Sequence, residues 1–138
     1  MTQRIAWEDS YATGISIIDK QHMQLVDTLN VLVDAIDSES RHGQIYDIIL
    51  QLKDYAKYHF STEEKLMQEY NYPAYDEHRM EHVTFVDQIT LFDLDTILAT
   101  DGLVWEVLHF LRQWLTTHIL VVDKQFAASV LTMQEASA

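Results

Sequence analysis

The chain has 138 residues, of which 48% are hydrophobic and 22% are charged, so it is long enough for one globular domain with one core. Its formal net charge of −13 argues against nucleic acid or an anionic membrane surface as a partner. The absence of cysteine excludes disulfides, thiolate metal clusters and thiol nucleophiles. No apolar run is long enough for a signal peptide or a membrane span, so we expect a soluble, cytoplasmic protein.

Few residues break the chain, because it contains only 3 glycines and 1 proline. They separate four helix-length segments, at residues 18–38, 43–70, 74–95 and 102–130. Each segment carries apolar residues at spacings of three and four, which is typical of an amphipathic helix. The sequence therefore predicts an all-α, up-down-up-down antiparallel four-helix bundle as a single domain over 1–138, with an N-terminal arm (1–17) and a C-terminal tail (131–138).

Each predicted helix also carries histidine or carboxylate side chains on or beside its apolar face. In chain order they are His22, His59, Glu63, His78, His82, His118 and Asp123. Burying these imidazoles and carboxylates without partners would cost several kcal/mol per group. A domain with a net stability of ~5–15 kcal/mol could not tolerate that cost. We therefore expect a bound cation to compensate them.

The spacing of these residues supports shared sites. The HxxxE motif at 59–63 and the HxxxH motif at 78–82 each place two side chains on one helix face. His118 and Asp123 are five residues apart, which fits one site less easily on a regular helix. We expect either a π-bulge between them or a carboxylate that reaches sideways between two ions.

The number and kind of donors favour a pair of metal ions. Seven donors exceed the four of a structural zinc site, whereas two ions that share two bridging carboxylates would use them all. Imidazole and carboxylate without sulfur suit iron, manganese or zinc. Two carboxylates offset less of the positive charge of highly oxidised metal ions than the carboxylate-rich ligand sets of the ferritin-like di-iron proteins do. This difference favours a site that holds dioxygen over one that activates it. The two other histidines, His42 and His109, are expected to be solvated.

The ordered series H, HxxxE, HxxxH and HxxxxD on four successive helices resembles the hemerythrins, most closely the single-domain bacterial members. The resemblance covers almost the whole chain and is carried by Trp7 and by residues 14–22, 59–64, 78–82 and 114–124. It implies a centre of two non-haem iron ions per chain, joined by an oxo or hydroxo bridge. The implied function is reversible binding of dioxygen for sensing, storage or delivery.

The resemblance also implies a role for each residue. One iron would be held by His78, His82 and His118 and the other by His22 and His59, with Glu63 and Asp123 bridging. The iron with two histidines would keep an open position for oxygen. Around it, an apolar oxygen pocket would be formed by Leu25, Phe60, Trp114, Leu115 and Ile119.

Two other classes of function remain open from the sequence. The same centre could belong to an enzyme, a di-iron peroxidase or a nitric oxide scavenger, with peroxide or nitric oxide as its ligand. Alternatively, the bundle could be a zinc-filled or metal-free interaction module. The sequence indicates no partner protein.

Overall fold

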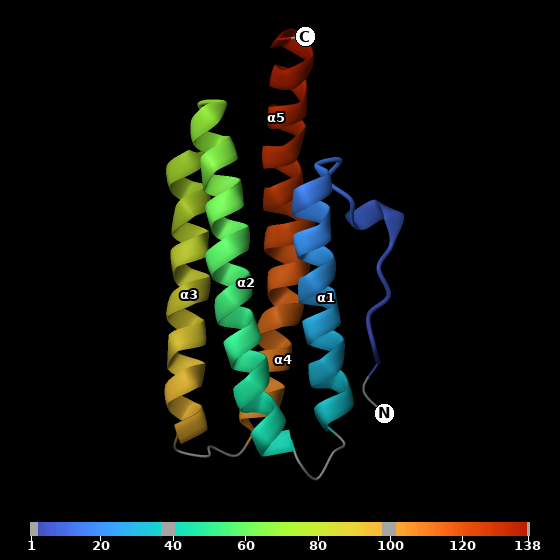
Figure 1. Cartoon of the computed structure of the whole chain (residues 1–138), viewed down its shortest axis with the longest axis vertical. Coiled ribbons are helices and arrows are strands. Elements are labelled where there is room, and N and C mark those ends of the chain that lie inside the picture. The colour runs from blue at the N-terminus through green and yellow to red at the C-terminus, as the bar shows by residue number, and fades with distance from the viewer. Residues whose placement is uncertain (1–2, 37–40, 98–101, 138) are drawn as a thin grey trace.

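The computed structural model describes residues 3–36, 41–97 and 102–137, and in these ranges the regular structure is entirely helical. Three long helices come first, α1 (Ser16–Ile36), α2 (Arg41–Glu69) and α3 (Tyr75–Ile97). The last rod is continuous and consists of α4 (Leu103–Gln113), the π-helical segment η2 (Trp114–Asp123) and α5 (Lys124–Ser137). The N-terminal arm, with a short 3-10 turn η1 (Asp9–Tyr11), runs beside α1 (Figure 1).

Consecutive helices of the bundle are neighbours, which confirms the predicted all-α, up-down-up-down fold. Helix α1 packs on α2 and α2 on α3, while α4 contacts both α1 and α3 and so closes the ring (Figure 1). Antiparallel neighbours follow from the short connections between long amphipathic helices. All four rods thus turn one apolar face toward a common axis.

Local hydrogen bonds fix where α1 begins and how α2 ends. The Asp19 carboxylate accepts hydrogen bonds from the backbone N–H groups of Thr13 and Gly14, at 2.7 and 3.3 Å, and so holds the chain entering α1. At the end of α2, Asn71 adopts a left-handed conformation with φ of 51°, and the Tyr72 N–H donates to the Met67 carbonyl at 2.8 Å. This is the capping pattern that ends a helix and reverses the chain.

The arm is attached to α1 by specific contacts. The Asn30 side chain accepts a hydrogen bond from the Ile5 N–H and donates one to the Ile5 carbonyl, each at 2.7 Å. Ile5 and Trp7 also pack against the main apolar core. The arm therefore covers one side of the bundle.

Two apolar clusters make up the core. The larger one contains most of the buried aliphatic and aromatic side chains of all four rods, and the smaller one consists of Met67, Phe126 and Val130. The buried polar side chains lie between them: Phe60 of the larger cluster stacks on His82, and Phe126 of the smaller one meets His78 edge-on. The polar residues are thus enclosed by apolar side chains.

The helix ends differ from the sequence prediction by a few residues, and two of the differences change the description of the chain. The last rod continues past residue 130 to Ser137, because residues 131–137 contain no glycine or proline and are mostly good helix formers. Helix α2 begins at Arg41, so His42 lies in its first turn and not in a connection. The side chain of His42 is outside the described residues, whereas His109 is exposed, as predicted. No helix in the described ranges is long and apolar enough to cross a membrane.

Candidate metal centre

All seven of the side chains singled out in the sequence are buried. The exposed fraction is between 0 and 3% for each member of the set His22, His59, Glu63, His78, His82, His118 and Asp123. They come from all four rods: one from α1, two from α2, two from α3 and two from η2. The helical periodicity of each segment already places these side chains inward, so no unusual backbone is needed in α1, α2 or α3.

The π-helical segment η2 brings His118 and Asp123, which are five residues apart, onto one face. In a π-helix the hydrogen bonds run from residue i to i+5, so residues five apart share a face. The π-helical stretch spans Trp114–Asp123 and ends at the carboxylate itself. His118 Nε2 lies 3.1 Å from Asp123 Oδ1 as a result. Of the two alternatives that the sequence left open, the structure has the π-helix.

The inward nitrogen of each histidine is Nε2, and these atoms converge on the two carboxylates. Asp123 Oδ1 lies 2.9 Å from His78 Nε2, and Asp123 Oδ2 lies 3.0 Å from His22 Nε2. Glu63 Oε1 lies 3.0 Å from His82 Nε2. The carboxylates therefore stand between imidazoles of different helices.

The donors fall into two overlapping groups whose ligand atoms lie within 4.8 Å of one another. One group contains three histidines, His78, His82 and His118, and the other contains two, His22 and His59. Glu63 and Asp123 belong to both groups. Two positions that share two carboxylates are the arrangement expected of a dinuclear site.

The polar atoms of this cluster fit a bound cation better than they fit one another. Four inward atoms make no aligned hydrogen bond to a described residue, namely Glu63 Oε2, His78 Nε2, His118 Nε2 and Asp123 Oδ1. His22 Nε2 and His59 Nε2 face each other at 3.1 Å, although two neutral imidazoles can share only one proton there. A metal ion requires several buried lone pairs that point at a common centre and are not used in hydrogen bonds.

Burial keeps two of the imidazoles neutral and so able to act as metal ligands. Burial lowers the pKa of His59 to about 4 and that of His82 to about 2, so both are neutral near pH 7 with a free lone pair. Burial, with the nearby Asp123, raises the pKa of Glu63 well above its usual value. Burial acts in the same direction on Asp123, but the close Nε2 atoms of the surrounding histidines outweigh it and lower that pKa. The surrounding histidines thus favour the charged form of Asp123, whereas burial disfavours the charged form of Glu63.

Three of the five histidines also donate a hydrogen bond from their outward-facing Nδ1 atom. His59 Nδ1–H donates to Gln21 Oε1 at 2.7 Å. His82 Nδ1–H donates to Glu64 Oε2 at 3.2 Å, and His118 Nδ1–H donates to Glu81 Oε1 at 3.1 Å. These contacts fix the tautomer that presents Nε2 to the centre.

The five residues predicted to form an oxygen pocket are all buried, with exposed fractions of 0 to 7% for Leu25, Phe60, Trp114, Leu115 and Ile119. Two of them stack on imidazoles of the three-histidine group. The ring of Phe60 lies 3.9 Å from that of His82, and the ring of Trp114 lies 3.9 Å from that of His118. The aromatic members of this set therefore restrict the orientation of the two histidine rings on which they stack.

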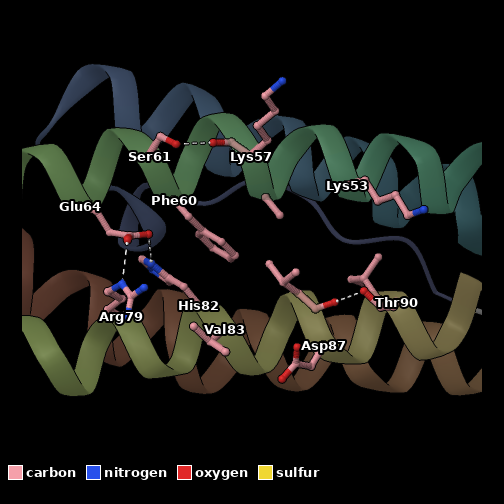
Figure 2. Close-up of a pocket in the computed structure, with 13 residues that line it drawn as sticks. Lys53, Lys57, Phe60, Ser61, Glu64, Arg79, His82, Val83, Asp87 and Thr90 are labelled. Atoms are coloured by element: carbon pink, nitrogen blue, oxygen red, sulfur yellow. Dashed lines mark hydrogen bonds and ion pairs between the residues drawn. The ribbon is translucent and has the colours of Figure 1, made fainter.

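A surface groove of about 530 Å³ lies between α2 and α3 and reaches this part of the centre. Figure 2 shows Glu64 of α2 extending across the groove toward His82 and Arg79 of α3, with the Phe60 ring directed into the same space. The Arg79 Nε lies 3.6 Å from Glu64 Oε1. One carboxylate thus links an exposed arginine to a buried imidazole.

The sequence did not single out the outer hydrogen-bond partners. Gln21, Glu64 and Glu81 each directly follow or precede a residue of the inward set, so the periodicity alone assigns them to the polar side of their helices. Tyr55 was missed as well, although it stacks on His59 at 4.9 Å. Its position four residues before His59 is a signal that could have placed it on the same face.

The fold and the site together define the class: a four-helix-bundle protein with a buried cluster of histidines and carboxylates suited to a pair of metal ions. The family model described as the hemerythrin HHE cation binding domain matches residues 13–129. The chain therefore belongs to the hemerythrin family, which consists of oxygen-binding proteins with a non-haem di-iron centre.

Individual relatives agree with this assignment. The chain is 32% identical to a bacteriohemerythrin of Clostridium acetobutylicum over 124 residues, which cover 87% of this chain and 96% of the relative. It is also 32% identical to a bacteriohemerythrin of Stenotrophomonas maltophilia, with 91% of this chain and 81% of the relative covered. A hemerythrin of Phascolopsis gouldii is 30% identical, with 90% and 91% covered.

Proposed function

We propose that this protein binds dioxygen reversibly, for sensing, storage or delivery in the cytoplasm, and is not an enzyme. The observation that carries the proposal is the convergence of five histidines and two carboxylates on two positions inside an apolar enclosure. When bound, an iron pair supplies the electrons with which dioxygen is held. The protein has to hold the pair, leave one coordination position open and exclude water.

Each ligand has a place in the proposal. His78, His82 and His118 would saturate one iron, whereas His22 and His59 would leave the second with an open position. Glu63 and Asp123 belong to both groups and would bridge. Because the donors come from four rods that pack on one another, the bundle would hold the two metal positions at a fixed separation.

The apolar side chains would protect bound oxygen. Leu25 lies one helical turn after His22 on α1, and Leu115 and Ile119 lie beside His118 in η2. Their burial removes water and proton donors from the space next to the open position, which would slow irreversible oxidation of the iron. We propose that Phe60 and Trp114 complete this wall from the side of the imidazoles on which they stack.

Metal analysis and oxygen titration test the proposal. We expect about two irons per chain, no colour in the reduced protein, a visible absorption band in air, and bleaching when oxygen is removed under inert gas. Oxidation in one pass to a form that cannot be bleached would contradict reversible binding. Steady consumption of peroxide or nitric oxide with a reductant, beyond the rate of free iron, would favour an enzyme.

A matched pair of histidine variants separates ligands from bystanders. His59→Ala should lower iron content and thermal stability together, because metal binding contributes to the free energy of folding. His109 is exposed and lies outside both donor groups, so His109→Ala should change neither quantity. Equal losses in the two variants would show that the assignment of histidines is wrong.

A further inference from the structure

The outward-facing nitrogens of the five histidines have unequal partners. In the three-histidine group, His82 and His118 each donate to a glutamate, Glu64 and Glu81. In the two-histidine group, His59 donates to the neutral amide of Gln21. Neither His22 Nδ1 nor His78 Nδ1 hydrogen-bonds to a described residue. The acidic partners therefore all lie on one side of the centre.

The charge of the acceptor matters because hydrogen bonds to ionised groups are about twice as strong as neutral ones. A carboxylate that accepts the Nδ1–H draws the proton outward and makes the opposite nitrogen more electron-rich. An electron-rich imidazole stabilises a cation of higher charge. An amide acceptor orients the ring in the same way but transfers less electron density.

We propose that Glu64 and Glu81 are positioning residues that make the three-histidine metal position the easier of the two to oxidise. Gln21 orients His59 without adding negative charge. The iron at the open position would therefore be harder to oxidise and would return more readily to its reduced state when the ligand leaves. This inference rests on the proposed di-iron site and deepens it, because it assigns the difference between the two irons to named residues outside the ligand set.

The surroundings of Glu64 suit this role. One carboxylate oxygen contacts His82 and the other lies near Arg79, so the side chain is held from both sides across the groove (Figure 2). Its side chain is 26% exposed, against 43% for Glu81. Glu64 is therefore the better shielded of the two, and its replacement should have the larger effect.

The experiment is a redox titration of the iron-loaded protein, with the first one-electron step followed by optical and electron paramagnetic resonance spectra. Glutamine is nearly isosteric with glutamate and still accepts a hydrogen bond, so Glu64→Gln should keep the fold and the iron. We expect it to disfavour the first oxidation about tenfold, which corresponds to a rise of about 59 mV in the one-electron potential. Glu81→Gln should act in the same direction by a smaller factor.

Two further variants make the result specific. Asp87 is an exposed carboxylate that lines the same groove and hydrogen-bonds to no described histidine, so Asp87→Asn removes the same charge without touching the centre. It should change the equilibrium less than about twofold. Gln21→Glu gives His59 a charged acceptor and should lower the potential of the second step, so that the two steps draw together.

The outcomes separate this inference from the proposed function. A shift in Glu64→Gln no larger than that in Asp87→Asn would overturn the role of Glu64, even if the wild-type protein binds oxygen reversibly. A specific shift in Glu64→Gln, together with a wild-type protein whose colour in air does not bleach under inert gas, would uphold the inference and reject the oxygen carrier. Unchanged steps in Gln21→Glu would also count against the charge argument.

Discussion

Leu25 offers a direct test of whether the apolar residues near the centre protect bound oxygen or only fill the core. Leu25 and Leu32 both lie on α1, with exposed fractions of 1% and 0%, and both belong to the larger apolar cluster. Leu25 is three residues from His22 and shares its face. Leu32 is ten residues from His22, about 15 Å along the helix. Leu25→Ala and Leu32→Ala are therefore matched in residue type, helix and burial, and they differ in distance from the donor cluster.

The expected losses of stability are alike. Truncating a fully buried leucine to alanine removes transfer free energy and leaves a cavity, at a cost of about 3 kcal/mol. For a chain of 138 residues the entropy of unfolding is roughly 290 cal/mol/K, so each variant should melt about 10 °C lower. Calorimetry of the iron-loaded proteins measures this, and similar values for the two variants establish that the packing defects are comparable.

The lifetime of the oxygenated form should then separate the variants. A cavity at Leu25 admits water and protons beside the open position, so we expect irreversible oxidation to become about tenfold faster, the effect of a barrier lowered by about 1.4 kcal/mol. Leu32→Ala should decay like the wild type. The decay of the visible band in air-saturated buffer measures both. Equal acceleration in both variants, or none in Leu25→Ala, would refute the protective role.

Three other predictions concern the ligands, protonation and the backbone. Glu63→Gln should leave the metal-free protein within about 1 kcal/mol of the wild type, because burial raises the pKa of this carboxyl and so disfavours its charged form. The same change should weaken iron binding by about 10- to 100-fold or more, which chelator competition measures. In the metal-free protein the pKa of His59 is about 4, below its unfolded value of about 6.5, so unfolded chains bind the proton first and stability falls as pH drops through that window. This contribution amounts to about 3 kcal/mol, and denaturant titrations of His59→Gln should show the pH slope reduced accordingly. Gly14 has φ of 91° and an added Cβ would lie 3.0 Å from Leu131 Cδ1, so Gly14→Ala should cost about 1–3 kcal/mol, and an unchanged melting temperature would contradict the strain.

Several features could be predicted because they depend only on helical periodicity. The spacing of apolar residues gave the number of long helices, and the few glycines and the proline gave the connections to within a few residues. The HxxxE and HxxxH spacings placed pairs of donors on one face before any tertiary contact was known. The end of the last helix was less predictable, since its apolar stripe stops near residue 130 while the chain remains a good helix former to Ser137.

The hydrogen-bond partners around the centre could not be predicted in this way. Glu64 contacts His82 and Glu81 contacts His118, and in both cases the two residues lie on different helices. Such contacts depend on the axial offset and the rotation of one helix relative to the next. Those two quantities come from the packing of many apolar side chains at once, and no local pattern encodes them.

The amino-acid sequence by itself determined that seven candidate metal ligands face the interior of a helical bundle, because the turn of an α-helix fixes which residues share a face. The tertiary structure brings those donors together in two groups, forms the π-helical segment that places Asp123 beside His118, and alone decided which histidines receive an acidic partner. Periodicity is a property of one helix, whereas a metal centre is assembled from atoms of all four rods whose relative heights and rotations are set by their packing.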